Sequence, residues 1–311
     1  MSQVVTIIFP VFALIGLGFV MVKRGLFSQS GVDDLIRFIF YLAVPSLLFR
    51  TSASGVMAER LELGIVLAYY GVGILVFFAA YFILKSKGHE QAVVGAMSGC
   101  FSNLALIGLP IVQTAYEPAA LVPLMTLITF NAMILFTLPC ILIESGRNPN
   151  ANLFNIIKNG VISALSNPLV IALVSGWLFA QFTIEMPIIL DRITELLSQA
   201  AAPCALFAVG AGMARYSFRL EETRSPVLIA STVKLIIMPF LVWLVCTYII
   251  QASPLWTMIA TLAAGMPTGA NPFILATRYQ TSDRVAGNAI LITTGLGLFS
   301  LSAFLLLFPA P

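Results

Sequence analysis

Two long apolar segments of this chain are each interrupted by residues that break helices. The later segment reads Gly-Met-Pro-Thr-Gly-Ala-Asn-Pro over residues 265–272, and it places Pro267, Gly269 and Pro272 within six positions. A proline has no amide hydrogen to donate, so a continuous helix is not expected there. Inside a bilayer, unpaired backbone groups are costly, and such a break persists only where protein or a wet cavity satisfies them.

The earlier segment, residues 98–110, carries a similar interruption with Asn103, Gly108 and Pro110 inside a second apolar run. Two broken segments in corresponding places of the two halves indicate the midplane binding site of a transporter. For either segment alone, a proline-kinked helix without further function is an equally good interpretation.

The composition places the chain in a membrane. Of its 311 residues, 59% are hydrophobic and only 9% are charged, which is typical of a polytopic membrane protein. The longest stretch poor in apolar runs, residues 144–160, is too short to fold alone, so residues 1–311 form one transmembrane domain. The net charge of +3 comes from lysines and arginines scattered over short loops. The expected surroundings are therefore the lipid bilayer, and nucleic acid is not a partner.

At about 20 residues per crossing, the apolar runs divide into ten spans with both chain ends on one side of the membrane. The predicted spans are residues 3–22, 34–53, 62–84, 91–115, 119–143, 161–181, 187–213, 225–250, 254–277 and 284–308.

The basic residues predict which side that is. Twelve lysines and arginines follow the odd-numbered spans, three lie in the opposite loops, and with Lys234 inside a span these account for all 16. Because cytoplasmic loops are enriched in Lys and Arg, both termini are expected in the periplasm.

A repeat appears when the sequence is shifted by 158 positions. Pro-Ser-Leu-Leu-Phe at residues 45–49 then aligns with Pro-Cys-Ala-Leu-Phe at 203–207, and Gly18 aligns with Gly176. A repeat of five spans, being odd, must insert its second copy upside down. The predicted fold is therefore an all-α membrane protein of ten transmembrane helices in two inverted five-helix repeats. These repeats cover about residues 1–144 and 160–311, are joined by a short cytoplasmic loop, and place broken helices 4 and 9 at a crossing.

Polar side chains at the two breaks are the candidates for binding a substrate. Ser102 and Asn103 lie in the first break, and Thr268 and Asn271 lie in the second. Their amides and hydroxyls could donate to a carboxylate together with the amides of half-helix N-termini, although capping of the helices is as good an interpretation. Asn131 and Asn288 are secondary candidates, because asparagines within membranes often only join helices.

Lys234 lies ten residues after Arg224, about 15 Å along a helix from the cytoplasmic interface. A charge near the centre of a membrane is a functional candidate. Three roles are open: contact with an anionic substrate, neutralisation of half-helix carbonyl ends, or extension towards the interface.

Other chemistry has few residues to use. The four cysteines fall inside apolar spans without metal-ligand spacing, and the single histidine, His89, lies in a loop. No nucleotide-binding loop or hydrolase motif is present, so neither an enzyme nor a cofactor is expected. The coupling ion could be H⁺ or Na⁺. Gly95-x-x-x-Gly99 favours internal packing but is also compatible with a homodimer.

Three segments together are similar to the auxin efflux carrier family, which includes plant auxin exporters and bacterial malonate and malate permeases. They are residues 45–49, residues 234–239 (Lys-Leu-Ile-Ile-Met-Pro), and the run from Arg278 to Ile290. The resemblance covers essentially the whole chain. It implies a ten-helix, inverted-repeat fold like that of bile-acid sodium symporters, and a site at the crossing of helices 4 and 9.

In this chain, the crossing implied by the resemblance would involve Asn103, Pro110, Pro267 and Asn271. The helix-breaking residues Gly108, Gly269 and Pro272 are expected at the same crossing because they interrupt the same two segments. The long cytoplasmic loop of the plant proteins is absent, which fits a bacterial carrier. The expected function is secondary transport of a small organic anion across a bacterial inner membrane. The alternatives are a sodium-coupled symporter of a larger amphipathic anion and a membrane sensor that does not transport.

Overall fold

The protein is described here by a computed structural model covering residues 2–54, 62–147, 165–182, 186–216 and 223–307, with residues 154, 158, 162 and 221. Across these residues the regular structure is helical, apart from one isolated antiparallel bridge between Ser102 and Thr268. The predicted all-helical class is confirmed for this part of the chain.

In the described part of the chain, five helices are long and apolar enough to cross a membrane: Thr6–Lys23, Gly64–Lys87, Ile188–Met213, Arg224–Ile250 and Asp283–Leu307. Four shorter helices are also apolar: Leu104–Ala115, Pro118–Asn131, Pro168–Gln181 and Pro254–Gly265. The first residues of the predicted span 161–181 lie largely outside the described part. The total of ten spans stays a prediction.

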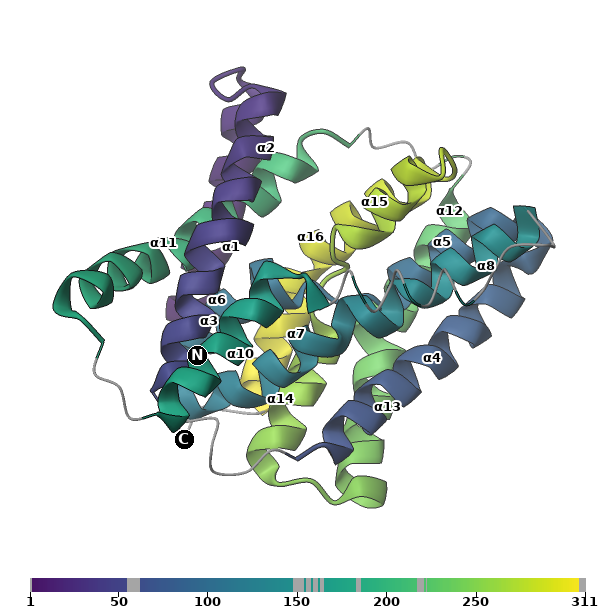
Figure 1. The fold of residues 1–311 in the computed structure, drawn as a ribbon. Coiled ribbons are helices and arrows are strands. Elements are labelled where there is room, and N and C mark those ends of the chain that lie inside the picture. The colour runs from purple at the N-terminus through teal and green to yellow at the C-terminus, as the bar shows by residue number, and fades with distance from the viewer. Residues whose placement is uncertain are drawn as a thin grey trace.

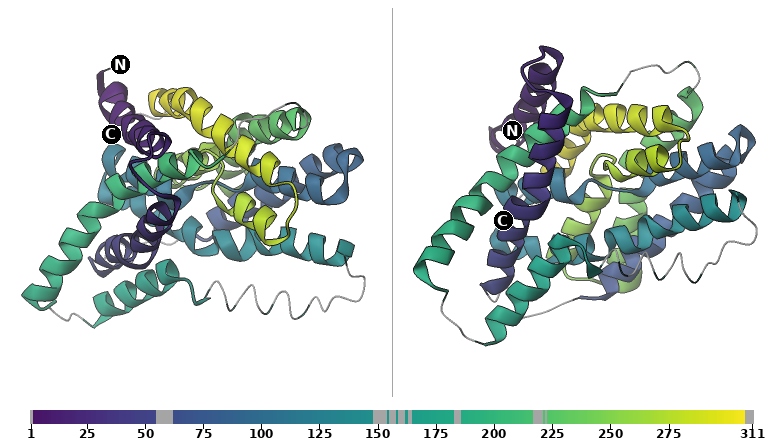
Figure 2. Two further views of the ribbon diagram at one scale, coloured as in Figure 1. Left: turned by 90° about the horizontal axis from the view of Figure 1, so that it is seen from above. Right: turned by 45° about the horizontal axis from the view of Figure 1, so that its top comes forward.

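One group of helices comprises α1 (Ser2–Lys23), α2 (Gln29–Phe38), α3 (Val44–Ala53), α10 (Pro168–Gln181) and α11 (Ile188–Met213). A π-helical turn, η1 (Ile39–Ala43), joins α2 to α3. α1 packs along α11 and α3 packs along α10, and Figures 1 and 2 show α11 crossing beside α1. The backbones approach closely, since a side chain at Gly18 would overlap the Phe207 carbonyl and one at Gly210 would overlap that of Ile15.

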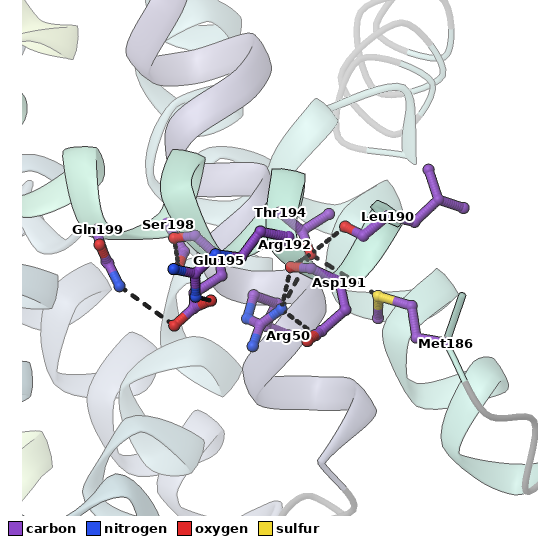
Figure 3. A network of polar contacts seen from close by, with 9 residues as sticks. All are labelled: Arg50, Met186, Leu190, Asp191, Arg192, Thr194, Glu195, Ser198 and Gln199. Atoms are coloured by element: carbon purple, nitrogen blue, oxygen red, sulfur yellow. Dashed lines mark hydrogen bonds and ion pairs between the residues drawn. The ribbon is translucent and has the colours of Figure 1, made fainter. Parts of the chain in front are cut away.

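A polar network joins α3 to the first turns of α11 (Figure 3). The Arg50 guanidinium donates to the backbone and side-chain oxygens of Asp191 and, at 3.1 Å, to Thr194 Oγ1. The next residue, Arg192, pairs with Glu195 at 2.6 Å. Because α11 ends at Met213, this network lies about 30 Å from the other end of the helix.

The second group begins with α4 (Gly64–Leu84) and α5 (His89–Cys100), which pack on each other and are linked by the 3₁₀ turn η3 (Lys85–Lys87). Next come η4 (Leu104–Gly108), α6 (Leu109–Ala115), η5 (Pro118–Ala120), α7 (Leu121–Leu135) and α8 (Thr137–Arg147). Its later helices are α12 (Arg224–Thr232), η6 (Val233–Ile237), α13 (Met238–Leu244), η7 (Val245–Ile250), α14 (Pro254–Gly265), α15 (Asn271–Arg278) and α16 (Asp283–Leu307). Gly95 and Gly99 face Leu84 and Val233 within the chain, which is internal packing.

Both predicted interruptions are present. α5 ends at Cys100, and η4 begins at Leu104 after an extended segment. α14 ends at Gly265, and α15 begins at Asn271. Gly108 and Pro110 lie beyond the first break, inside the second half of that helix, and Pro272 lies in the first turn of α15.

Three prolines within helices follow a widened turn instead of a break. Pro45, Pro110 and Pro239 each stand two residues after a five-residue π-helical turn, η1, η4 or η6. A proline cannot donate its amide, and its ring crowds the carbonyl four residues before it. Widening the preceding turn relieves that crowding, so these helices continue where a sequence reading would place a kink.

Candidate functional site

The two extended segments cross and hydrogen-bond to each other as a short antiparallel pair. The backbone amide of Asn103 donates to the Pro267 carbonyl at 2.9 Å, and the backbone amide of Gly269 donates to the Phe101 carbonyl at 2.9 Å. Gly269 is needed for this approach, because an added Cβ would lie 3.1 Å from the Phe101 ring and 3.2 Å from the Ser102 carbonyl oxygen. The backbone groups released by the two breaks thus satisfy one another, as a non-helical segment in a membrane requires.

Two helices end at the crossing, and each has a donor at its last turn. Thr268 Oγ1 donates to the carbonyl of Ser98 in α5 at 2.7 Å. Lys234 Nζ donates to the carbonyl of Ala264 in α14 at 2.5 Å. Because helix C-termini carry partial negative charge, the Lys234 ammonium is placed where a cation is stabilised.

Lys234 is completely buried, and its ammonium also donates to Ser102 Oγ at 2.6 Å. Met238 Sδ lies 3.5 Å from the same nitrogen. Among the described residues, no carboxylate comes within ion-pair distance of Lys234. Its partners are therefore the carbonyl end of α14 and a hydroxyl of the crossing.

Ser102 and Thr268 both form hydrogen bonds within the protein. Ser102 Oγ accepts a second hydrogen bond, from Tyr69 at 2.8 Å, and the Thr268 amide donates to Thr293 Oγ1 at 3.0 Å. Ser102 is 1% exposed and Thr268 is fully buried. These contacts fix the crossing to α4, η6 and α16.

Two further helices begin at the crossing. Asn103 precedes η4, and its side-chain oxygen accepts from the Leu106 amide at 3.2 Å, which caps the new helix. Asn271 is the first residue of α15, whose cap residue Ala270 supplies no side-chain bond. Helix N-termini present amide donors and partial positive charge, so this side of the crossing suits an anion.

A pocket of about 540 Å³ lies against these helix beginnings, and its size suits a small ligand. Four asparagines line it: Asn103, Asn131 on α7, Asn167 before α10, and Asn271. Asn131 is 8% exposed, and its side-chain oxygen is buried without a hydrogen-bond partner. The remaining wall is mainly apolar and includes Ile36, Phe40, Phe101, Leu104, Leu106, Ile128, Leu169, Val209, Met213, Phe273 and Ile290. We call this the crossing pocket.

The predicted site residues separate into two sets. Those that line the crossing pocket are Ser102, Asn103, Gly269 and Asn271. Those outside its lining are Gly108, Pro110, Lys234, Pro267, Thr268 and Pro272. Sequence reasoning did not assign Asp33, Asn167, Arg215 or Arg278 to a site, although Asp33, Arg215 and Arg278 each lie within two residues of the end of a predicted span.

The last turn of α15 is tied to α8 and α5 beside the pocket. Arg147 donates to the Tyr279 carbonyl at 2.7 Å and pairs with Glu90 at 2.6 Å, while the Tyr279 hydroxyl donates to Glu144 at 3.0 Å. The hydrogen bonds from Arg147 hold the pKa of Glu90 below its usual value. These contacts hold Tyr279 in place, directly after Arg278.

Apolar helices that meet at two crossing interruptions beside an amide-lined pocket define a membrane transporter. Residues 3–305 match the family described as "Membrane transport protein". The chain therefore belongs to that family, the auxin efflux carriers.

Two relatives align over nearly their full lengths. The chain is 27% identical to a protein of Rhizobium meliloti (strain 1021) named "Putative malonate transporter", covering 99% of this chain and 96% of the relative. It is 25% identical to "Uncharacterized transporter YfdV" of Escherichia coli (strain K12), covering 93% of this chain and 92% of the relative. The family and these names indicate a transporter rather than an enzyme.

Proposed function

We propose that this protein is a secondary active carrier that moves a small organic anion, a carboxylate, across a bacterial inner membrane by alternating access. One observation carries the proposal: the crossing pocket lies against the N-terminal ends of both interrupted helices. Among the described residues lining it, the one carboxylate is Asp33, which is already paired with an arginine.

The polar groups in the pocket favour a carboxylate over a cation. Asn103 and Asn271 each carry two amide hydrogens, and the helix beginnings add backbone donors. A cation would need several oxygen ligands, and the residues described contain no group of acidic, histidine or cysteine side chains arranged to hold a metal ion. The name of the Rhizobium meliloti relative supports malonate as the first substrate to test.

Contacts between α1, α3, α10 and α11 support the inverted repeat. Gly18 lies against the Phe207 carbonyl, and Gly176 lies against that of Phe49. Adding 158 to the number of Gly18 gives Gly176, and subtracting 158 from that of Phe207 gives Phe49, so the two contacts join equivalent positions of the repeat. Equivalent residues thus exchange partners, as in two copies related by a two-fold axis.

A second pair of contacts repeats the relationship. Gly210 lies against the Ile15 carbonyl, and Ser52 Oγ donates to the Leu173 carbonyl at 2.8 Å. The same shift relates Ser52 to Gly210 and Ile15 to Leu173. On this basis we propose ten transmembrane helices in two inverted repeats, with the interrupted helices as the fourth and ninth.

The proposed orientation places both termini in the periplasm. Reporter fusions test it. An alkaline phosphatase fusion after Pro311 should be active, whereas one near Asn150 should be inactive and a green fluorescent protein fusion there should fluoresce. The reverse pattern would contradict both the orientation and the inverted repeat.

Ligand stabilisation of the purified protein tests the substrate class. A ligand that binds only the folded protein stabilises it by about 2.7 kcal/mol at a concentration of 100 Kd. Malonate and related carboxylates should therefore raise the melting temperature in detergent, whereas matched amines and neutral amides should not. Absence of stabilisation by every carboxylate, with stabilisation by a compound of another class, would contradict the proposed function.

A further inference from the structure

Few charged residues line the crossing pocket. Of the described residues that line it, three are charged: Asp33 in α2, Arg215 just after α11, and Arg278 at the end of α15. The side chains of Asp33 and Arg215 are 51% and 25% exposed, and Arg278 is exposed as well. We call these three residues the mouth of the pocket.

Arg215 is only partly satisfied by the protein. One terminal nitrogen donates to Asp33 at 2.7 Å, and the other donates to the Gln29 carbonyl at 2.8 Å. Its Nε is buried and has no hydrogen-bond partner. A guanidinium has five N–H donors in a fork that matches a carboxylate, so Arg215 can donate to a second carboxylate or exchange the one it holds.

Arg278 is available to an anion. No described carboxylate lies within ion-pair distance of it, and its guanidinium rests 5.7 Å from the centroid of the Tyr279 ring. A contact with the ring face leaves the in-plane N–H groups free to donate. Because Asp33 balances Arg215, Arg278 gives the mouth a net positive charge.

The Asp33–Arg215 pair can exchange with little loss. Half-exposed ion pairs contribute little to stability, because water already solvates both charges. An entering carboxylate that replaces Asp33 keeps the guanidinium paired, and the released Asp33 returns to water. Asp33 therefore competes with an anionic ligand for Arg215 but does not prevent the ligand from binding.

We propose that Arg215 and Arg278 form an anion-capture site, which binds a substrate carboxylate at the mouth before it reaches Asn103 and Asn271. In the carrier without substrate, Asp33 forms an ion pair with Arg215, and the substrate carboxylate displaces it. This rests on the proposed function and assigns its entry step to named residues. The competing role for these arginines is contact with anionic lipid headgroups at the membrane surface.

The test is calorimetric titration of malonate into the purified full-length protein in detergent without added lipid. Arg215→Gln and Arg278→Gln should each weaken malonate binding about tenfold, the loss expected for one charge-assisted hydrogen bond. Asp33→Asn should strengthen binding, by up to about fivefold, because it removes the internal competitor. Opposite signs for the two members of one ion pair are not expected from a purely structural pair.

Matched controls lie on the same helix. Asp34 and Arg37 form an exposed pair at 3.1 Å but do not line the pocket, so Asp34→Asn and Arg37→Gln should leave malonate affinity unchanged. Arg278→Gln breaks no described ion pair, which keeps the test decisive if Arg215→Gln folds poorly.

Unchanged affinity in both Arg215→Gln and Arg278→Gln would overturn the capture site. Weaker binding in both Asp33→Asn and Arg215→Gln would also overturn it, as a structural pair. If the wild-type protein binds neither malonate nor any other carboxylate, the proposed function itself fails, and the capture site with it.

Discussion

Asn271→Ala is expected to weaken carboxylate binding by about ten- to a hundredfold while leaving the melting temperature nearly unchanged. The side chain lines the crossing pocket at the first turn of α15, where the helix cap does not depend on it. Hydrogen bonds to a charged group contribute about 1.5–3 kcal/mol each, and 1.4 kcal/mol corresponds to a tenfold change in affinity. Titration with malonate and a thermal melt of the same sample measure both quantities.

Asn103 needs a different substitution, because its oxygen also caps η4. Asn103→Ser retains a capping oxygen but removes the amide donors, so it should lose affinity with little loss of stability. Asn103→Ala should lower both.

Asn288 supplies the contrast. Its amide donates to Thr223 at 2.9 Å, and it is fully buried on α16 outside the pocket lining. Asn288→Ala should lower the melting temperature without affecting affinity. If Asn271→Ala and Asn103→Ser both bind malonate like the wild type, the substrate site lies elsewhere.

Lys234→Gln is expected to destabilise the protein. The change removes a buried charge that donates to Ala264 and Ser102, and an acceptor left without a donor costs about 1–3 kcal/mol. The carbonyl end of α14 would also lose the cation that offsets its partial charge. The melting temperature should fall clearly, and malonate affinity should change less than in Asn271→Ala, because Lys234 lies outside the pocket lining.

Lys87→Gln is the matched control, since Lys87 is exposed at the end of η3. It should change the free energy of unfolding by less than about 0.5 kcal/mol. A Lys234→Gln protein that melts like the wild type but binds malonate poorly would instead show that the ammonium contacts the substrate.

The sequence predicted the helix interruptions because proline and glycine act locally on the backbone. Residues 101–103 and 266–270 break their helices, but Pro110 does not, because a π-helical turn accommodates it. Local rules identify the residue that cannot continue a regular helix. Whether the helix ends or widens depends on what can satisfy the released backbone groups, which here is the other extended segment.

The hydrogen-bond partners of the individual site residues could not be predicted from the sequence. Ser102 and Asn103 are neighbours in sequence and both line the pocket, yet the Ser102 hydroxyl accepts from Lys234 and Tyr69, whereas the Asn103 side-chain oxygen caps η4. The partners of Ser102 lie 132 and 33 residues away, so tertiary packing alone brings them together. Arg215 and Asp33, 182 residues apart, illustrate the same point at the mouth.

Uptake of radiolabelled malonate into proteoliposomes tests the central claim most directly. Sodium and proton gradients are imposed separately, and vesicles preloaded with unlabelled malonate measure exchange. We expect uptake above that of protein-free vesicles, driven by one of the two gradients or by exchange, and reduced in the Asn271→Ala protein. If no organic anion is taken up under any gradient or by exchange, while the folded protein binds malonate, the chain is a membrane sensor rather than a carrier.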